Sequence, residues 1–323
     1  MQNRKLRYGL FTPIIETRPA DALLYVCGDQ AVVQTRRGFL KTGIVAGAGA
    51  TPLFAWAYER FRSGAELVWQ PGIAEETQMD FDINGFRMHY EIFGSGGEPL
   101  LWLHGWSGSG EDWKFISNDV PAGFRVLGPD MRGNGASSGF EGTHTFRQSA
   151  RDIFALLDHL GIQHIKAIGL SGGGITLLHM ATQQPERIVA MVAVSAPPYF
   201  PAQARTLQRT FSFESLPKRE QDMMRQRSKG GDKQIEWLIE QSHKMADSYE
   251  DVNFTPPLLQ TIKAKTLIVF GDADPLYPVK LAFELQDAIP HSSLWVVPKG
   301  GHGPIFGPNA ARFAETATAF LRG

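Results

Sequence analysis

The sequence contains very little cysteine: Cys27 is the single one among 323 residues. One cysteine cannot form a disulfide within the chain, so the folded body must be stable without that cross-link. A body without disulfides can fold in a reducing compartment and still work in an oxidising one.

Motifs for metals, nucleotides and nucleic acids are also missing. The sequence has no C-x-x-C, no H-E-x-x-H and no Walker pattern, so we expect no metal and no cofactor. Lys and Arg number 32 and Asp and Glu 33, a formal net charge of −1 that does not point to nucleic acid. The length suits one large α/β domain or a domain with an insertion.

Long hydrophobic runs are missing as well. The uncharged stretch TGIVAGAGATPLFAWA, 42–57, is short of the ~20 apolar residues of a membrane helix, so we expect no stable membrane span. It follows the basic segment TRRGFLK, 35–41. A basic segment, a modest apolar segment and a small-residue end are the parts of a signal peptide. The pair Arg36–Arg37, followed by Phe39, Leu40 and Lys41, resembles the twin-arginine export signal, which carries folded proteins.

We therefore expect residues 1–57 to be an N-terminal extension and twin-arginine signal peptide. The export machinery would be a partner, and the body would be periplasmic or extracellular. Cleavage is expected after AWA, 55–57, and an uncleaved segment would act as an anchor. Initiation at Val32 or Val33 would give a compact signal peptide. Residues 58–323 keep 25 basic and 30 acidic side chains, a mildly acidic balance that does not favour an anionic membrane.

The body alternates strand and helix patterns. Alternating apolar residues flank Asn84–Gly85 and predict a hairpin. Apolar runs of the buried-strand type follow at 99–103, 125–129, 165–170, 187–195, 265–271 and 292–297. The clearest helix is predicted over 146–160, where Thr145 and Gln148 suit a capping box. This order predicts an α/β fold with a mostly parallel sheet flanked by helices.

One region interrupts this order. Residues 199–256 have no strand pattern and are rich in charge and helix formers. We interpret them as an inserted helical cap, with 58–198 and 257–323 as the core. The cap carries Phe211, Phe213, Met223, Met224 and Trp237, which pack its helices or line the roof of a pocket.

A serine stands between a predicted strand and a predicted helix. The segment GLSGGG, 169–174, fits the G-x-S-x-G nucleophile elbow with Ser171 at its centre. A sharp strand-to-helix turn presents the serine at the carboxyl edge of the sheet, and glycines on either side avoid collisions. The alternative is a glycine-rich turn with an incidental serine. The flanking strand and helix favour the nucleophile.

A serine nucleophile needs a base and an orienting acid. His302 stands in the glycine-rich loop KGGHGPIFG after a predicted strand and is the expected base. Asp272 and Asp274 both follow the strand TLIVF, and we favour Asp274 as the acid, with Asp272 ordering the turn. The order Ser171, Asp274, His302 is the chain order of this kind of triad.

The oxyanion donors are expected from two backbone amides. One is Gly172, directly after the nucleophile, and the other is Trp106 in the loop HGWSGSGEDW. The substrate pocket is expected to include Trp106, Leu170, Tyr277 and Phe306.

Together these pieces resemble the α/β-hydrolase family. From about residue 78 to the end the chain is similar to a capped serine α/β-hydrolase, with HGW at 104, DMRGNGASSG at 130–139, GLSGGG at 169, GDADPLYP at 271 and GGHG at 300 in family order. The resemblance gives Asp130 and Arg132 a structural role beneath the site. Epoxide hydrolases and haloalkane dehalogenases of the family attack with a carboxylate, whereas this chain has Ser171.

The resemblance implies hydrolysis of a carboxylic ester or lactone of a small, fairly apolar molecule through an acyl-enzyme. Three alternatives share the triad: a cofactor-free haloperoxidase or perhydrolase, a carbon–carbon bond hydrolase, and a slow-turnover ligand receptor. A peptidase would need cap carboxylates for a substrate amine, and the candidates are Glu214, Glu220, Glu236 and Glu240.

Overall fold

The computed structural model describes residues 22–27, 30–35, 38–41, 76–117 and 119–323. The chain divides into two units, Met1–Gly49 and Ala50–Gly323. In the first unit, β1 (Ala22–Cys27), β2 (Gln30–Thr35) and β3 (Gly38–Lys41) form an antiparallel sheet in that order.

The predicted signal peptide falls mostly outside the described residues. Arg36, Arg37 and the apolar segment 42–57 are among the residues that are not described. The signal peptide and its cleavage therefore stay predictions. Within the described part of the chain, no helix has the length and apolar character that crossing a membrane requires.

The second unit is built on an eight-stranded sheet in the order β11-β10-β9-β8-β6-β7-β5-β4. Neighbouring strands from β11 to β7 are parallel, and β5 is antiparallel to both β4 and β7. The prediction of a mostly parallel sheet is confirmed. The strands are β4 (Glu76–Ile83), β5 (Phe86–Phe93), β6 (Glu98–Leu103), β7 (Phe124–Pro129), β8 (Ile165–Leu170), β9 (Ile188–Val194), β10 (Lys265–Gly271) and β11 (Ser292–Val297).

The predicted hairpin joins β4 and β5. Ile83 pairs with Phe86 across the turn, and Asn84 and Gly85 both have positive φ, 45° and 80°. Asparagine and glycine tolerate this backbone at low cost, and the turn matches the twist of the strands. The hairpin is therefore confirmed.

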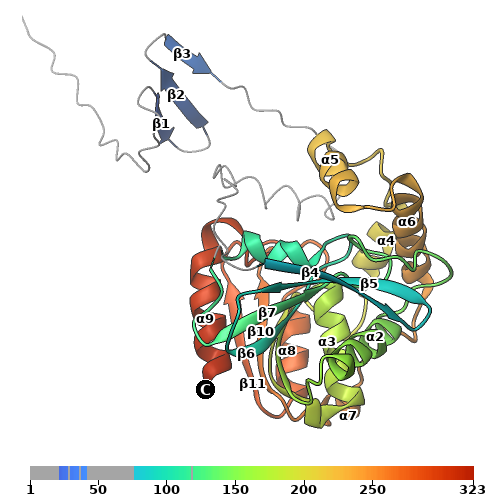
Figure 1. Cartoon of the computed structure of the whole chain (residues 1–323). Coiled ribbons are helices and arrows are strands. Elements are labelled where there is room, and N and C mark those ends of the chain that lie inside the picture. Colours follow the sequence, from blue (N-terminus) through green and yellow to red (C-terminus); the bar gives the residue numbers. More distant parts are fainter. Residues whose placement is uncertain (1–21, 28–29, 36–37, 42–75, 118) are drawn as a thin grey trace, which may run out of the picture. The chain divides into compact units, whose positions relative to one another are not determined.

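Helices cover both faces of the sheet, as predicted. Because successive strand side chains point to opposite faces, Leu101 and Leu103 join one apolar cluster, and Leu100 and Trp102 join another. The helices α2 (Phe146–His159), α3 (Gly172–Gln183) and α8 (Lys280–Ala288) pack in the first cluster, and α9 (Ala310–Arg322) packs in the second. Figure 1 shows α9 across the sheet from α2 and α3.

The start of α2 shows half of the predicted capping box. The Thr145 side chain accepts the Gln148 amide at 3.1 Å. The Gln148 side chain instead donates to Asp152 at 3.0 Å. The Asp251 carboxylate, from the end of the insertion, accepts the amides of Phe146 and Arg147 at 2.7 and 3.1 Å. A distant carboxylate thus satisfies donors that local sequence leaves open.

The insertion between β9 and β10 carries α4 (Ala202–Thr210), α5 (Lys218–Arg227) and α6 (Asp232–Asp247), followed by the short helix α7 (Pro256–Leu259). An isolated bridge between Tyr199 and Asn253 joins its two ends. The helices share a small apolar cluster of their own, which includes Phe211, Met224 and Trp237. Figure 1 shows α4, α5 and α6 grouped beside the sheet.

Polar contacts dock this cap on the core. Arg227 pairs with the buried Asp112 at 2.5 Å. Gln234 donates to the carbonyls of Gly133 and Gly135, and Trp237 donates to the carbonyl of Gly142 at 3.1 Å. The loop beneath the cap is thereby held in a single arrangement.

Candidate active site

Ser171 lies at the strained junction of β8 and α3. Its φ is 51° and its ψ is −113°, a conformation that L-residues rarely adopt. Its amide donates to the Val194 carbonyl at 2.8 Å, which ties the turn to β9. The turn places the serine at the carboxyl edge of the parallel sheet, where open α/β sheets bind their ligands.

The neighbouring glycines are required by space. A Cβ on Gly169 would lie 2.6 Å from the Gly173 carbonyl oxygen. A Cβ on Gly173 would lie 2.2 Å from the Leu103 carbonyl oxygen. Both contacts are to backbone atoms, which cannot rotate away. The glycine pattern of the elbow is therefore explained by collisions in this fold.

The structure brings together the three residues predicted as the triad. Ser171 Oγ lies 2.8 Å from Nε2 of His302, and His302 Nδ1 lies 2.9 Å from Oδ2 of Asp274. All three are buried. The other carboxylate oxygen of Asp274 accepts the amides of Leu276 and Tyr277 at 2.8 and 3.1 Å. These two donors fix the carboxylate in one orientation toward the imidazole.

The alternative acid, Asp272, does not join this relay. Its side chain is exposed, and its amide donates to the Val297 carbonyl. The structure therefore brings His302 to Asp274 rather than to Asp272. Burial raises the pKa of the nearby Tyr277, whose ring meets the His302 ring edge-on at 5.0 Å.

The two predicted oxyanion donors are neighbours in space. A Cβ on Gly172 would lie only 3.4 Å from the backbone nitrogen of Trp106. The Trp106 amide donates to no backbone acceptor in the part of the chain that the structure describes. Gly172 is the first residue of α3, where the helix dipole favours negative charge. An oxyanion formed on a carbonyl at Ser171 would meet both features.

Residues below the site hold the Trp106 loop in place. His104 Nδ1 donates to the Gly105 carbonyl at 2.7 Å, and its Nε2 accepts the Met131 amide at 3.0 Å. Burial lowers the pKa of His104 to about 4, so the ring is neutral and braces the loop. The side-chain oxygen of Asn134 accepts the Ser107 amide at 3.0 Å, which is a further hydrogen bond to this loop.

Asp130 and Arg132 also order this region. Asp130 accepts the amides of Gly110 and Ala136, each at 2.7 Å, and burial raises its pKa to about 7. The Arg132 guanidinium donates to the buried Asp152 at 2.9 Å. Asp130 therefore connects loops, and Arg132 ties its loop to α2; these hydrogen bonds do not lead to Ser171.

A cavity opens above Ser171 and His302. Two of the four predicted pocket residues line it, and two do not. Trp106 and Tyr277 line the cavity. Leu170 and Phe306 do not line it; both are buried in the apolar cluster on the face of α9. Leu170 is the strand residue before the serine, and strand alternation turns its side chain to that face.

Most of the cavity wall comes from apolar side chains that the motifs did not indicate. Phe146 begins α2, Phe200 follows β9, and Met245 comes from α6. Of the five cap residues singled out in the sequence, Phe211, Met223 and Met224 line the cavity, whereas Phe213 packs in the cap cluster and Trp237 stacks on Trp106 of the core. The only signal in the sequence for Phe200 was its place in the segment that follows β9, at the carboxyl edge of the sheet.

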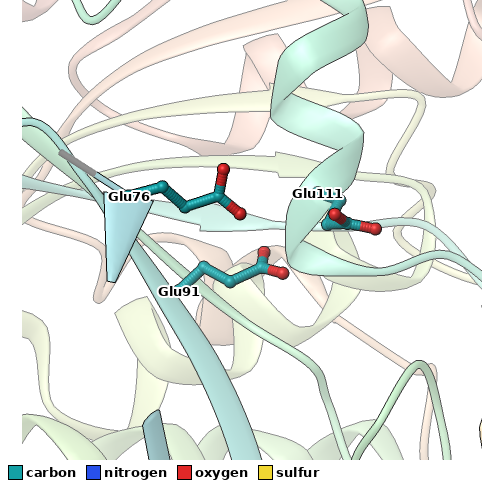
Figure 2. Close-up of side chains that lie close together, drawn as sticks. All are labelled: Glu76, Glu91 and Glu111. Carbon is teal, nitrogen blue, oxygen red and sulfur yellow. The ribbon is translucent and has the colours of Figure 1, made fainter. Parts of the chain in front are cut away.

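Three glutamates gather at a second place, outside the cavity. The carboxylates of Glu76, Glu91 and Glu111 come within 4.8 Å of one another (Figure 2). Lys114 already lies among them, 3.0 Å from Glu76 and 3.1 Å from Glu111. The Glu91 carboxylate, which accepts from the His89 ring, raises the pKa of His89 to about 9, and the protonated ring supplies a second positive charge. A metal cation would have to displace the ammonium group, so we assign this cluster no metal.

Comparisons with known proteins agree with this architecture. Residues 98–210 match the family model described as the alpha/beta hydrolase fold. A soluble epoxide hydrolase from a Corynebacterium strain is 39% identical over 111 residues, which are 33% of this chain and 37% of that protein. The chain thus spans well under half of the length of that relative.

Longer matches are less identical. A 2-hydroxy-6-oxononadienedioate/2-hydroxy-6-oxononatrienedioate hydrolase from Burkholderia vietnamiensis is 27% identical over 265 residues, 73% of this chain and 91% of that protein. The structure of a meta-cleavage product hydrolase from Pseudomonas fluorescens superposes with a TM-score of 0.64 at 19% identity, over 76% of this chain and 97% of that one. The chain is therefore a protein of the α/β-hydrolase fold.

Proposed function

We propose that this protein is a serine hydrolase that cleaves a carboxylic ester or lactone of a small, fairly apolar molecule. The observation that carries the proposal is the relay from Ser171 through His302 to Asp274, with both distances below 3 Å, at the floor of an apolar cavity. Serine attacks a carbonyl only when a positioned base removes its proton, and this geometry supplies that base.

The mechanism follows from the geometry. His302 Nε2 takes the hydroxyl proton as Ser171 Oγ attacks the carbonyl carbon, and Asp274 stabilises the imidazolium that forms. The oxyanion is held by the amides of Trp106 and Gly172, where one such donor contributes about 3 kcal/mol to the transition state. His302 then protonates the leaving alcohol. Water enters by the reverse sequence and releases the acid from the acyl-enzyme.

The lining of the cavity supports an apolar substrate. Six of its side chains are Phe146, Phe200, Phe211, Leu216, Met224 and Met245. Burying a ligand CH₂ group against such a wall contributes about 0.8 kcal/mol. Methionine side chains adapt to ligand shape more readily than branched ones, so we expect tolerance of several acyl chain lengths.

Hydrolysis of a carbon–carbon bond is the second candidate, because the long match is to an oxo-dienedioate hydrolase. The substrate in that name is a dicarboxylate. In this cavity a carboxylate would meet the buried Glu220, and the basic Arg227 already pairs with Asp112. Like charges in a buried site are repulsive, so we place the neutral ester first.

The test is active-site labelling of the full-length protein with a fluorophosphonate, located by mass spectrometry, together with turnover of short- and medium-chain nitrophenyl esters. We expect label on Ser171 and steady turnover. Ser171→Ala should lose the label and at least about a thousandfold of the rate, with an unchanged melting temperature. An unchanged rate in this variant would overturn the proposal, and label without steady turnover would favour a slow ligand receptor.

Export by the twin-arginine route is a separate proposal that depends on the sequence alone. Cell fractionation with Arg36→Lys and Arg37→Lys substituted together tests it. We expect the protein to move from the exported fraction to the cytoplasm. Export of the double variant at the original level would contradict the proposal.

A further inference from the structure

One acidic side chain in the cap lines the cavity, most of whose wall is apolar. Glu220 lies in the first turn of α5, and only 6% of its surface is exposed. Its Oε2 atom has no hydrogen-bond partner among the described residues. A buried carboxylate oxygen without a donor is costly to the protein alone. This cost makes a ligand donor the natural partner.

A second acceptor reaches the same cavity from another helix. Gln208, on α4, is 7% exposed and lines the cavity, and its Oε1 also has no hydrogen-bond partner within the described parts of the chain. Two residues from separate elements of the cap thus line one cavity, and each has a buried oxygen acceptor without a partner among the described residues. Buried polar groups are normally paired, and a donor group on a ligand in this cavity would supply the partner that each oxygen lacks.

The other three cap glutamates considered as candidates from the sequence differ from Glu220. Glu214, Glu236 and Glu240 are exposed, and none lines the cavity. Glu240 pairs with Lys244 one helical turn away at 2.8 Å. Charge on those residues is solvated and needs no ligand. Glu220 is therefore set apart by its position and not by its residue type.

We propose that Glu220 and Gln208 form a subsite that accepts a hydrogen-bond donor on the substrate, remote from the scissile ester. The donor is a hydroxyl or an ammonium group at the end of the chain that fills the apolar cavity. This inference rests on the proposed ester hydrolysis, because it concerns the same cavity.

The chemistry of the two acceptors supports this class of ligand. Carboxylate and amide oxygens both accept, so a donor satisfies them and a methyl group does not. A site with buried acceptors rejects an analogue that lacks the donor much more strongly than an apolar wall rejects one methylene. Burial raises the pKa of Glu220 above its ordinary value, so this carboxylate is protonated at a higher pH than an exposed glutamate.

The experiment compares three series of methyl esters on the full-length protein, with chains that end in hydroxyl, ammonium or methyl and vary from four to eight carbons. The readout is the ratio of kcat/KM for the donor ester to kcat/KM for the methyl-ended ester of the same length. At the matching length we expect a ratio of about 10 to 100, the factor that one hydrogen bond to a charged group supplies.

Three variants and one control separate the roles. Glu220→Gln should keep the preference for hydroxyl and lose the preference for ammonium. Glu220→Leu should lose both, and Gln208→Met should lower the hydroxyl ratio. Glu236→Gln, an exposed cap glutamate, is the matched control and should leave the ratios at their wild-type values. In the wild type the ammonium preference should fall as the pH drops through the raised pKa of Glu220.

The outcomes are distinct. A hydroxyl-only or ammonium-only preference that Glu220→Leu removes supports the subsite and identifies the donor. Ratios near one at every length, or ratios that Glu220→Gln, Glu220→Leu and Gln208→Met all leave unchanged, overturn the subsite while hydrolysis stands. No turnover of any ester, including the methyl-ended series, would instead count against the proposed function.

Discussion

Asp274→Asn tests the catalytic relay at its least accessible member. In the wild type, Oδ1 of Asp274 accepts two amides, those of Leu276 and Tyr277, while Oδ2 faces Nδ1 of His302. Asparagine keeps the size of the side chain. Its single oxygen will remain with the two backbone donors, because an NH₂ group there would meet two N–H groups. The NH₂ group must then face His302.

This reversal changes the histidine tautomer. An NH₂ donor at 2.9 Å requires Nδ1 of His302 to accept, so the ring proton moves to Nε2. A protonated Nε2 cannot take the proton from Ser171, 2.8 Å away. We expect kcat to fall by about 10⁴, equivalent to about 5.5 kcal/mol of activation free energy. Stability should change by less than about 1 kcal/mol, because both backbone donors keep their acceptor.

Steady-state kinetics with a nitrophenyl ester and thermal unfolding measure the two effects. Asp272→Asn is the matched control, since that carboxylate is exposed in the same turn, whereas Asp274 is the carboxylate 2.9 Å from Nδ1 of His302. Its kcat should stay within about twofold of the wild type. A loss below tenfold in folded Asp274→Asn, or equal losses in the two variants, would refute the tautomer argument.

Two further predictions concern the fold around the site. Gly173→Ala places a Cβ 2.2 Å from the backbone oxygen of Leu103, so we expect a loss of more than about 3 kcal/mol in the free energy of unfolding, measured by denaturant titration; a near-native midpoint would contradict it. Burial lowers the pKa of His144 to about 3. The buried neutral ring therefore contributes fully to the free energy of unfolding above pH 6.5, and this contribution is lost as the pH falls toward 3. Between pH 7 and pH 5, the free energy of unfolding measured by urea titration should fall by about 2 kcal/mol less in His144→Phe than in the wild type. An equal fall in both proteins would rule this out.

The local features of the fold could be predicted from the sequence because their causes are local. The hairpin at Asn84–Gly85 needs positive φ at two adjacent residues, and the sequence supplies residues that tolerate it. The elbow at Ser171 needs glycines where a Cβ would meet backbone. The mostly parallel sheet with helices on both faces followed from the alternation of apolar runs with helical segments. Half of the α2 cap was missed because Asp251 is distant in sequence.

The cavity could not be predicted in the same way. Leu170 adjoins the nucleophile in sequence but turns to the opposite face of the sheet, whereas Phe200 and Met245 line the cavity from separate elements. Membership of the cavity depends on how the cap docks, through contacts such as Arg227 with Asp112. Such contacts join residues that have no shared pattern in the chain.

The sequence by itself therefore determined the strands, the elbow and the candidates for the relay, because short-range sterics and turn chemistry leave a signature in adjacent residues. The tertiary structure alone decided which acid faces His302, which apolar side chains line the cavity, and which of the cap glutamates is buried in its wall. Those choices depend on distances between elements far apart in the chain. Burial and proximity, rather than residue type, give Glu220 its proposed role.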